Sequence, residues 1–72
     1  MKDLTDKQKE CLIIINSFIK QNGYPPTVRE IGKELGNNSP ATTLKHMKEL
    51  KRKGYITWIE RQNRTIKILK VK

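Results

Sequence analysis

The sequence predicts a mainly helical domain that closes with a small β-hairpin, and two observations support this prediction. The first is a series of three helix-start signals, each followed by apolar residues at spacings of three and four and then by a glycine. The second is a change of the apolar spacing to two after Gly54, which is typical of strands. A length of 72 residues fits a single domain, 1–72, with a small core.

The first helix is expected over about 6–22. Thr5 and Gln8 form a capping-box pattern, in which the hydroxyl accepts a free backbone N–H and the glutamine side chain bonds back. Gly23 can take the left-handed conformation that ends a helix. The expected inward face consists of Leu12, Ile15, Phe18 and Ile19.

The second helix is expected over about 28–35. Thr27 and Glu30 form another capping box, and Gly36 ends the apolar pattern. Its expected inward residues are Val28, Ile31 and Leu35. Asn37 and Asn38 then read as a polar turn.

The third helix is expected over about 40–53. Ser39 suits the N-cap, and Pro40 suits the first helical position, where its missing N–H has no partner to lose. Gly54 ends the helix. Thr43, Met47 and Leu50 are expected to face inward. Leu44 could face either the core or the outside.

Two strands are expected over about 55–59 and 65–69, joined by the polar residues 60–64. The side chains expected to face the helices are Ile56, Trp58, Ile66 and Ile68. A short helix, a turn and a longer helix form a helix-turn-helix unit, and a hairpin after it forms a wing. The predicted fold is therefore a winged helix-turn-helix, with three helices and a two-stranded antiparallel wing.

The net charge of +9 lies almost entirely in the second half of the chain. Residues 37–72 contain ten basic and two acidic side chains. This asymmetry indicates a polyanionic partner, nucleic acid first and an anionic membrane surface second, although a merely solvated surface is the alternative. No run of 18 apolar residues occurs, so we expect no membrane span.

The second helix of a helix-turn-helix enters the DNA major groove with its N-terminal residues at the base edges. Here the candidate base-contacting residues are Ser39, Ala41, Thr42, Leu44 and Lys45. Hydroxyls can donate or accept, a lysine can reach guanine, and an apolar group can pack on a thymine methyl. Alternatively, small polar residues stand at this helix start only because they cap it.

Basic and polar residues elsewhere suit contact with DNA phosphates, each adding to the salt dependence of binding. The expected phosphate-contacting residues are Thr27, Arg29, His46, Lys48, Arg52, Lys53, Arg61 and Arg64, and Lys51 is a further candidate. For any single lysine, a solvated surface position is the alternative.

Catalytic and metal-binding constellations are not expected. His46 is the only histidine and has no second ligand nearby in sequence, and Ser39 is better explained as a cap. Cys11 is the only cysteine, so it cannot form an internal disulfide, which fits a reducing cytoplasm and a buried structural role. Trp58 could stack on a base, but in a small core it more often packs. We therefore expect no enzyme, no metal, no cofactor and no small-molecule ligand.

Several runs of the chain resemble the N-terminal DNA-binding domain of the LexA family of SOS-response repressors. They are 4–8, 23–32, 35–36, 39–40, 46–48 and 52–56, with Leu50 and Arg64-Thr65-Ile66. The run Gly-Tyr-Pro-Pro-Thr-Val-Arg-Glu-Ile is the most specific of them. The resemblance extends over nearly the whole chain.

The resemblance implies a repressor that binds a gapped palindromic operator as a weak dimer, in the SOS response or in phage or mobile-element regulation. Helix 39–53 would lie in the major groove, and the wing residues 60–64 on the backbone. By position, the family's base-contacting set corresponds to Ser39, Ala41, Thr42, Leu44 and Lys45. The family often has a polar or charged residue where this chain has Leu44, so its operator is not transferred to this chain.

LexA repressors also have a C-terminal domain with a Ser–Lys catalytic pair, a self-cleavage site and the main dimer contacts. We do not expect these within the 72 residues, and the chain could be an excised domain or a standalone regulator. Two other functions remain open, a nonspecific nucleic-acid binder and a winged helix that binds a protein partner. The expected location is the cytoplasm of a bacterium.

Overall fold

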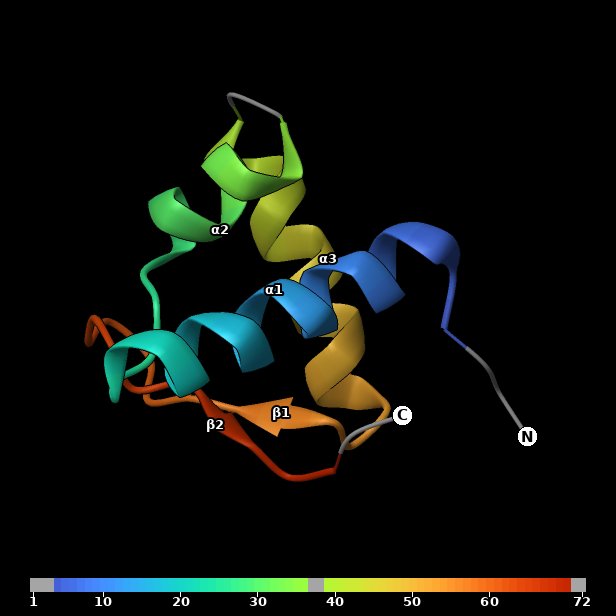
Figure 1. Cartoon of the computed structure of the whole chain (residues 1–72). Coiled ribbons are helices and arrows are strands. Elements are labelled where there is room, and N and C mark those ends of the chain that lie inside the picture. Colours follow the sequence, from blue (N-terminus) through green and yellow to red (C-terminus); the bar gives the residue numbers. More distant parts are fainter. Residues whose placement is uncertain (1–3, 37–38, 71–72) are drawn as a thin grey trace.

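The computed structural model describes residues 4–36 and 39–70, and the turn expected at Asn37 and Asn38 lies outside this described part. The elements are α1 (Asp6–Asn22), α2 (Val28–Leu35), α3 (Pro40–Arg52), β1 (Ile56–Thr57) and β2 (Lys67–Ile68). The three helices pack against one another, and the antiparallel hairpin lies across one end of this bundle (Figure 1). The prediction of a winged helix-turn-helix, mainly helical with a small β-hairpin, is confirmed.

Local hydrogen bonds fix where α1 and α2 begin. The Thr5 hydroxyl accepts the Gln8 backbone N–H at 3.2 Å, and Gln8 Oε1 accepts the Thr5 N–H at 3.2 Å. Thr27 and Glu30 repeat this arrangement, at 3.2 Å and 2.9 Å. Each box satisfies two backbone donors that the first helical turn leaves without a partner. Gly23 ends α1 at φ 80°, in the left-handed region.

The third helix begins as expected and ends one residue early. The Ser39 hydroxyl accepts the Thr42 backbone N–H at 3.3 Å. Lys53 is the C-cap, and Gly54 at φ 87° turns the chain toward the hairpin. The Tyr55 N–H then donates back to the Leu50 carbonyl at 2.9 Å, which closes the helix.

The strands are shorter than the five-residue runs 55–59 and 65–69 expected from the alternation. Among residues 4–36 and 39–70, the ladder consists of Ile56 paired with Ile68 and Thr57 paired with Lys67. Beyond Thr57 a side chain replaces the ladder, because the Ile59 N–H donates to the Thr65 hydroxyl at 2.9 Å. The two segments of the hairpin therefore stay side by side toward the loop without forming regular β-strands.

The core lies where the three helices meet the inner face of the hairpin. Its buried residues are Leu4, Cys11, Leu12, Ile15, Ile31, Leu35, Met47, Leu50, Tyr55, Ile56 and Ile66. Thr43 is also fully buried, one turn before Met47 as expected. The partly buried side chains packed on this core are Ile14, Ile19, Val28, Leu44, Trp58 and Ile68.

Two aromatic residues have surroundings that the spacing alone does not predict. Phe18 was expected on the inward face of α1, but it is half-buried and packs edge-to-face on Tyr24, with ring centroids 5.7 Å apart. Trp58 is half-buried, and the Lys51 ammonium lies 4.6 Å from its ring centroid. The packing interpretation of Trp58 therefore fits the structure, since one face of the ring is covered.

Cys11 is fully buried, and burial, with a smaller effect of the Glu10 charge, raises the pKa of its thiol to about 12. Because the thiolate is the reactive form, we expect the folded protein to resist a colorimetric disulfide reagent at neutral pH. One thiol per chain should react after unfolding in denaturant. Fast reaction of the native protein would show that Cys11 is not buried in solution.

Candidate nucleic-acid interface

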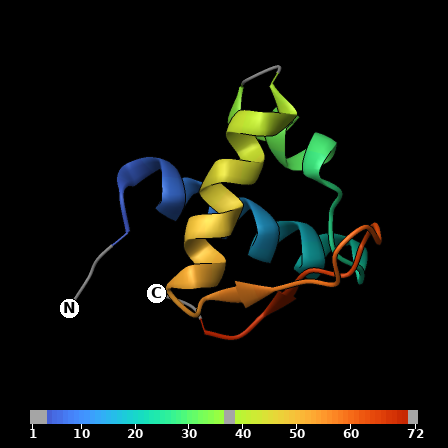
Figure 2. The ribbon, with the colours of Figure 1, turned by 180° about the vertical axis from the view of Figure 1, so that it is seen from behind.

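One face of α3 is exposed along its whole length, on the side of the bundle opposite α1 (Figure 2). The opposite face is anchored in the core by Thr43, Met47 and Leu50. Lys45 follows Ala41 and Thr42 at spacings of four and three, and Lys48 and Arg52 then follow at three and four, which places these exposed side chains in one stripe. We call this set the α3 stripe: Ala41, Thr42, Lys45, Lys48 and Arg52.

The N-terminal part of the α3 stripe contains most of the residues predicted to contact bases. Ala41, Thr42 and Lys45 of the stripe are exposed, and so is Ser39, the N-cap just before α3. Serine and threonine hydroxyls, a small apolar side chain and a lysine at one helix start can together distinguish base pairs. A rigid helix presents them, because the Ser39 cap and the buried face fix its start.

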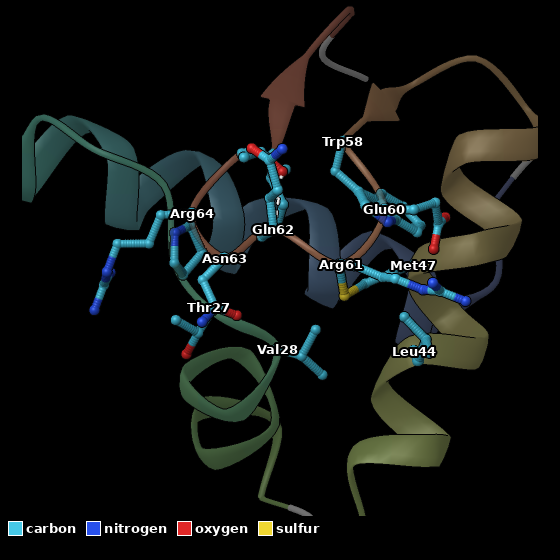
Figure 3. Close-up of a pocket in the computed structure, with 13 residues that line it drawn as sticks. Thr27, Val28, Leu44, Met47, Trp58, Glu60, Arg61, Gln62, Asn63 and Arg64 are labelled. Atoms are coloured by element: carbon cyan, nitrogen blue, oxygen red, sulfur yellow. Dashed lines mark hydrogen bonds between the residues drawn. The ribbon is translucent and has the colours of Figure 1, made fainter.

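Leu44 is the exception among the predicted base-contacting residues, because it is half-buried and packs on the core. It lines a groove between α2, α3 and the wing loop, where it lies opposite Val28 with Met47 beside it (Figure 3). Of the two orientations that the sequence left open, the structure favours the inward one. Only part of this side chain remains available to a partner.

The residues predicted to contact phosphates differ in how available they are. Arg29, Lys48, Arg52, Arg61 and Arg64 are exposed, whereas Thr27, His46 and Lys53 are half-buried. The side chain of Thr27 caps α2, so only part of its hydrogen-bonding capacity is left. Lys48 belongs to the α3 stripe and stands one helical turn beyond Lys45.

Three further cations have partners within the protein. Arg52 Nη2 lies 2.7 Å from Glu49 Oε1, and this hydrogen bond lowers the pKa of the Glu49 carboxyl. Lys53 Nζ donates to Gln8 Oε1 at 2.9 Å. Lys51 Nζ lies 3.7 Å from Glu60 Oε2. Exposed pairs of this kind contribute little stability, so Arg52 can exchange its partner for a phosphate at small cost.

Arg64 is held far more firmly than the other cations. Its Nη1 and Nη2 donate to the two carboxylate oxygens of Glu30 at 3.0 Å each, and Nη1 also donates to the Pro25 carbonyl at 3.1 Å. The guanidinium carbon lies 4.8 Å from the centroid of the Tyr24 ring. The Arg64 hydrogen bond is the main cause of the lowered pKa of the Glu30 carboxyl. In Figure 3 the Arg64 side chain points away from α3.

Sequence reasoning missed these partners of the basic residues. Glu30 was expected only as a capping residue, yet it lies 34 positions from Arg64 and binds it. Gln8, also a capping residue, binds Lys53 across 45 positions. No local pattern contains this information, although the third position of a capping box does mark a fixed side chain.

The described part of the chain contains no group of three His, Cys, Asp or Glu side chains that could hold a metal ion. None of its helices is both long and apolar enough to cross a membrane. What the described surface presents is a helix with an exposed basic stripe beside a loop that contains Arg61 and Arg64.

Residues 1–65 match the family model described as the LexA DNA binding domain. The chain belongs to this family. It is 49% identical over 70 residues to the LexA repressor of Desulfatibacillum aliphaticivorans, covering 97% of this chain and 34% of that protein. The LexA repressor of Thermotoga petrophila is 45% identical over 71 residues, covering 99% of this chain and 34% of its own length. The resemblance to LexA DNA-binding domains is confirmed.

The LexA repressor of Leptospira interrogans gives the same picture, with 43% identity over 70 residues and 34% of that protein covered. The chain thus spans about a third of the curated relatives that it matches. The matched family is that of the DNA-binding domain, and no protease domain is part of this match.

Proposed function

We propose that this LexA-family domain binds double-stranded DNA sequence-specifically and serves transcriptional repression of the LexA type. The α3 stripe would lie in the major groove, with the wing loop 60–64 against the DNA backbone. The main support is the exposed, basic face of α3, in a chain that belongs to the LexA DNA-binding family. The regulated process would be the SOS response or the control of a phage or mobile element.

The proposed base-contacting residues are those at the start of α3. Hydroxyls of Ser39 and Thr42 can donate or accept, and Lys45 can reach guanine acceptors. Ala41 suits a thymine methyl, and Leu44 contributes only through the exposed part of its side chain.

The proposed phosphate-contacting residues surround this region on α2, α3 and the wing loop. They are Thr27, Arg29, His46, Lys48, Arg52, Lys53 and Arg61. Arg64 is proposed below for a different role, because its guanidinium is already held by Glu30 and Pro25.

The proposed DNA site is a gapped palindrome bound by a weak homodimer. A two-fold symmetric pair of helix-turn-helix units reads two related half-sites one or more helical turns apart. The proposed cellular location is the bacterial cytoplasm, and the proposed binding mode requires neither a metal nor a small-molecule cofactor.

A nonspecific nucleic-acid binder is the second candidate, because the net charge of +9 would attract any polyanion. Selection of binding sites from a random duplex pool separates the two functions. A gapped palindrome, bound roughly a thousandfold or more tighter than random duplex when two copies bind together, supports the first. Salt-sensitive binding without an enriched sequence supports the second. Absence of binding to any duplex would contradict both and favour a protein partner.

Lys48→Ala is expected to weaken binding to the selected duplex and to a random duplex by a similar factor, because a contact with a backbone phosphate does not depend on the base sequence. The plot of log affinity against log salt concentration has a negative slope, and its magnitude should decrease by about 0.9 for one lost phosphate contact. A salt titration by fluorescence anisotropy measures both quantities. Lys9→Ala on α1 is the matched control, since it removes the same charge from an exposed position outside the α3 stripe. Equal effects of the two variants would contradict a contact by Lys48.

A further inference from the structure

The wing loop is attached to the helices on both sides of its turn. On one side, Glu60 forms an ion pair with Lys51 of α3. On the other, Arg64 binds the start of α2 through Glu30. Between these attachments lie Arg61, Gln62 and Asn63, all exposed, which we call the wing tip. The loop passes close to the segment that joins α1 to α2 in both views (Figures 1 and 2).

The Arg64 attachment is geometrically specific. Two hydrogen bonds, each with an N···O distance of 3.0 Å, join the guanidinium to both carboxylate oxygens of Glu30. This bidentate arrangement fixes the direction of the side chain as well as its distance. The Pro25 carbonyl and the Tyr24 ring hold the same group from two other directions. Lysine cannot reproduce this planar arrangement.

Glu30 links this attachment to the helix-turn-helix itself. Its Oε1 accepts both the Thr27 backbone N–H at 2.9 Å and Arg64 Nη1 at 3.0 Å. The wing loop is thus bonded to the residues where α2 begins, and α2 packs directly against α3. This pair, together with the Lys51–Glu60 ion pair, connects the wing tip to the helices that present the α3 stripe.

Two residues of the wing loop have an unusual backbone conformation. Arg61 and Arg64 lie at φ 66° and φ 57°, in the left-handed region that side chains other than glycine rarely adopt. Such conformations persist when surrounding contacts hold them. The contacts of Arg64 with Glu30 and Pro25 are suited to that task.

We propose that Arg64 is a positioning residue for DNA binding, which holds the wing tip in place through Glu30 and does not itself contact a phosphate. The inference rests on the proposed function, in which the wing faces the DNA backbone. Contact with a phosphate would require Arg64 to leave Glu30, and the released carboxylate would then stand near the phosphate that Arg64 binds. Arg61, on the wing tip, is left as the phosphate contact of the wing.

The decisive variant is Glu30→Gln. A glutamine keeps the capping box, as Gln8 does at the same position of α1, but it loses the charged pair with Arg64. We expect binding to the selected duplex to weaken about three- to tenfold, because the freed loop must be ordered on binding. If Arg64 is instead a phosphate contact, the variant should bind equally well or more tightly, because Arg64 is released and the net charge rises.

Glu34→Gln is the matched control, since it makes the same charge change at an exposed position of the same helix. Its affinity should equal or slightly exceed that of the parent protein. Thermal unfolding of each variant confirms that affinities are compared between folded proteins. Arg64→Lys is a second variant that leaves Glu30 in place. A positioning role predicts that it binds more weakly than the parent protein despite the retained charge, whereas a phosphate contact predicts an affinity close to that of the parent protein.

A double-mutant cycle with Arg61→Ala separates positioning from a general loss of stability. Positioning predicts that Arg61→Ala weakens binding in the parent protein but has little further effect in the Glu30→Gln protein. Additive effects of the two changes would overturn the proposal. If the parent protein binds no duplex, the proposed function fails; if it binds and Glu30→Gln binds as tightly, only the positioning role fails.

Discussion

Replacing Leu50 by alanine is expected to lower the free energy of unfolding by about 2–5 kcal/mol. Leu50 is fully buried on the inner face of α3, and the neighbouring core cannot close the space that its side chain leaves. Domains have only about 5–15 kcal/mol of stability in total, so this loss should shift the unfolding midpoint strongly. The change in the free energy of unfolding can be measured by urea titration, with the helical circular dichroism signal as the readout.

Leu69→Ala is the matched control for Leu50→Ala, because it makes the same change where the side chain is 55% exposed. We expect it to shift the midpoint far less. Similar shifts for the two variants would mean that α3 is not anchored in the core through Leu50. The outward direction of the α3 stripe would then lose its basis, since it follows from which face is buried.

The second large effect is expected from Thr42→Ala and Lys45→Ala at the start of α3. Each should lower the affinity for the selected duplex, Lys45→Ala by about 1–3 kcal/mol, or roughly five- to 150-fold, if it reads a guanine. Affinity for random duplex should change much less, because base contacts contribute little there. Fluorescence anisotropy with both duplexes at one salt concentration gives the ratio.

These two variants contrast with Lys48→Ala on the same stripe. A changed ratio between selected and random duplex identifies base reading, whereas an unchanged ratio with lower affinity identifies phosphate contact. If Thr42→Ala leaves both affinity and preference untouched, the placement of the start of α3 in the major groove is wrong.

The helical part of the fold could be predicted from the sequence because its signals are local. Capping residues act within four positions of each helix start, and Gly23 and Gly54 act at single positions. The strand lengths could not be predicted, because the alternation continues through Ile59 while the Thr65 hydroxyl takes the place of a ladder bond. Such a substitution depends on how the loop closes, which periodicity does not specify.

Some features of the candidate site follow from local spacing in the sequence, and others depend on contacts between distant segments. The exposure of Thr42 and Lys45 follows from helical spacing once Met47 is placed in the core. The position of Leu44 depends on the groove between α2, α3 and the wing, and the partner of Arg64 lies 34 positions away. Contacts between distant segments form only in the folded chain, so residue type alone suggested a phosphate contact for Arg64.

Chemical-shift mapping would show directly whether the α3 stripe contacts the DNA. Nuclear magnetic resonance spectra of the 72-residue chain would be recorded as the selected duplex is added. We expect the largest amide shift changes at 39–48 and in the wing tip, with little change around the exposed Ile13 on α1. Large changes around Ile13 with unchanged signals from the α3 stripe would show that DNA binds elsewhere than on α3.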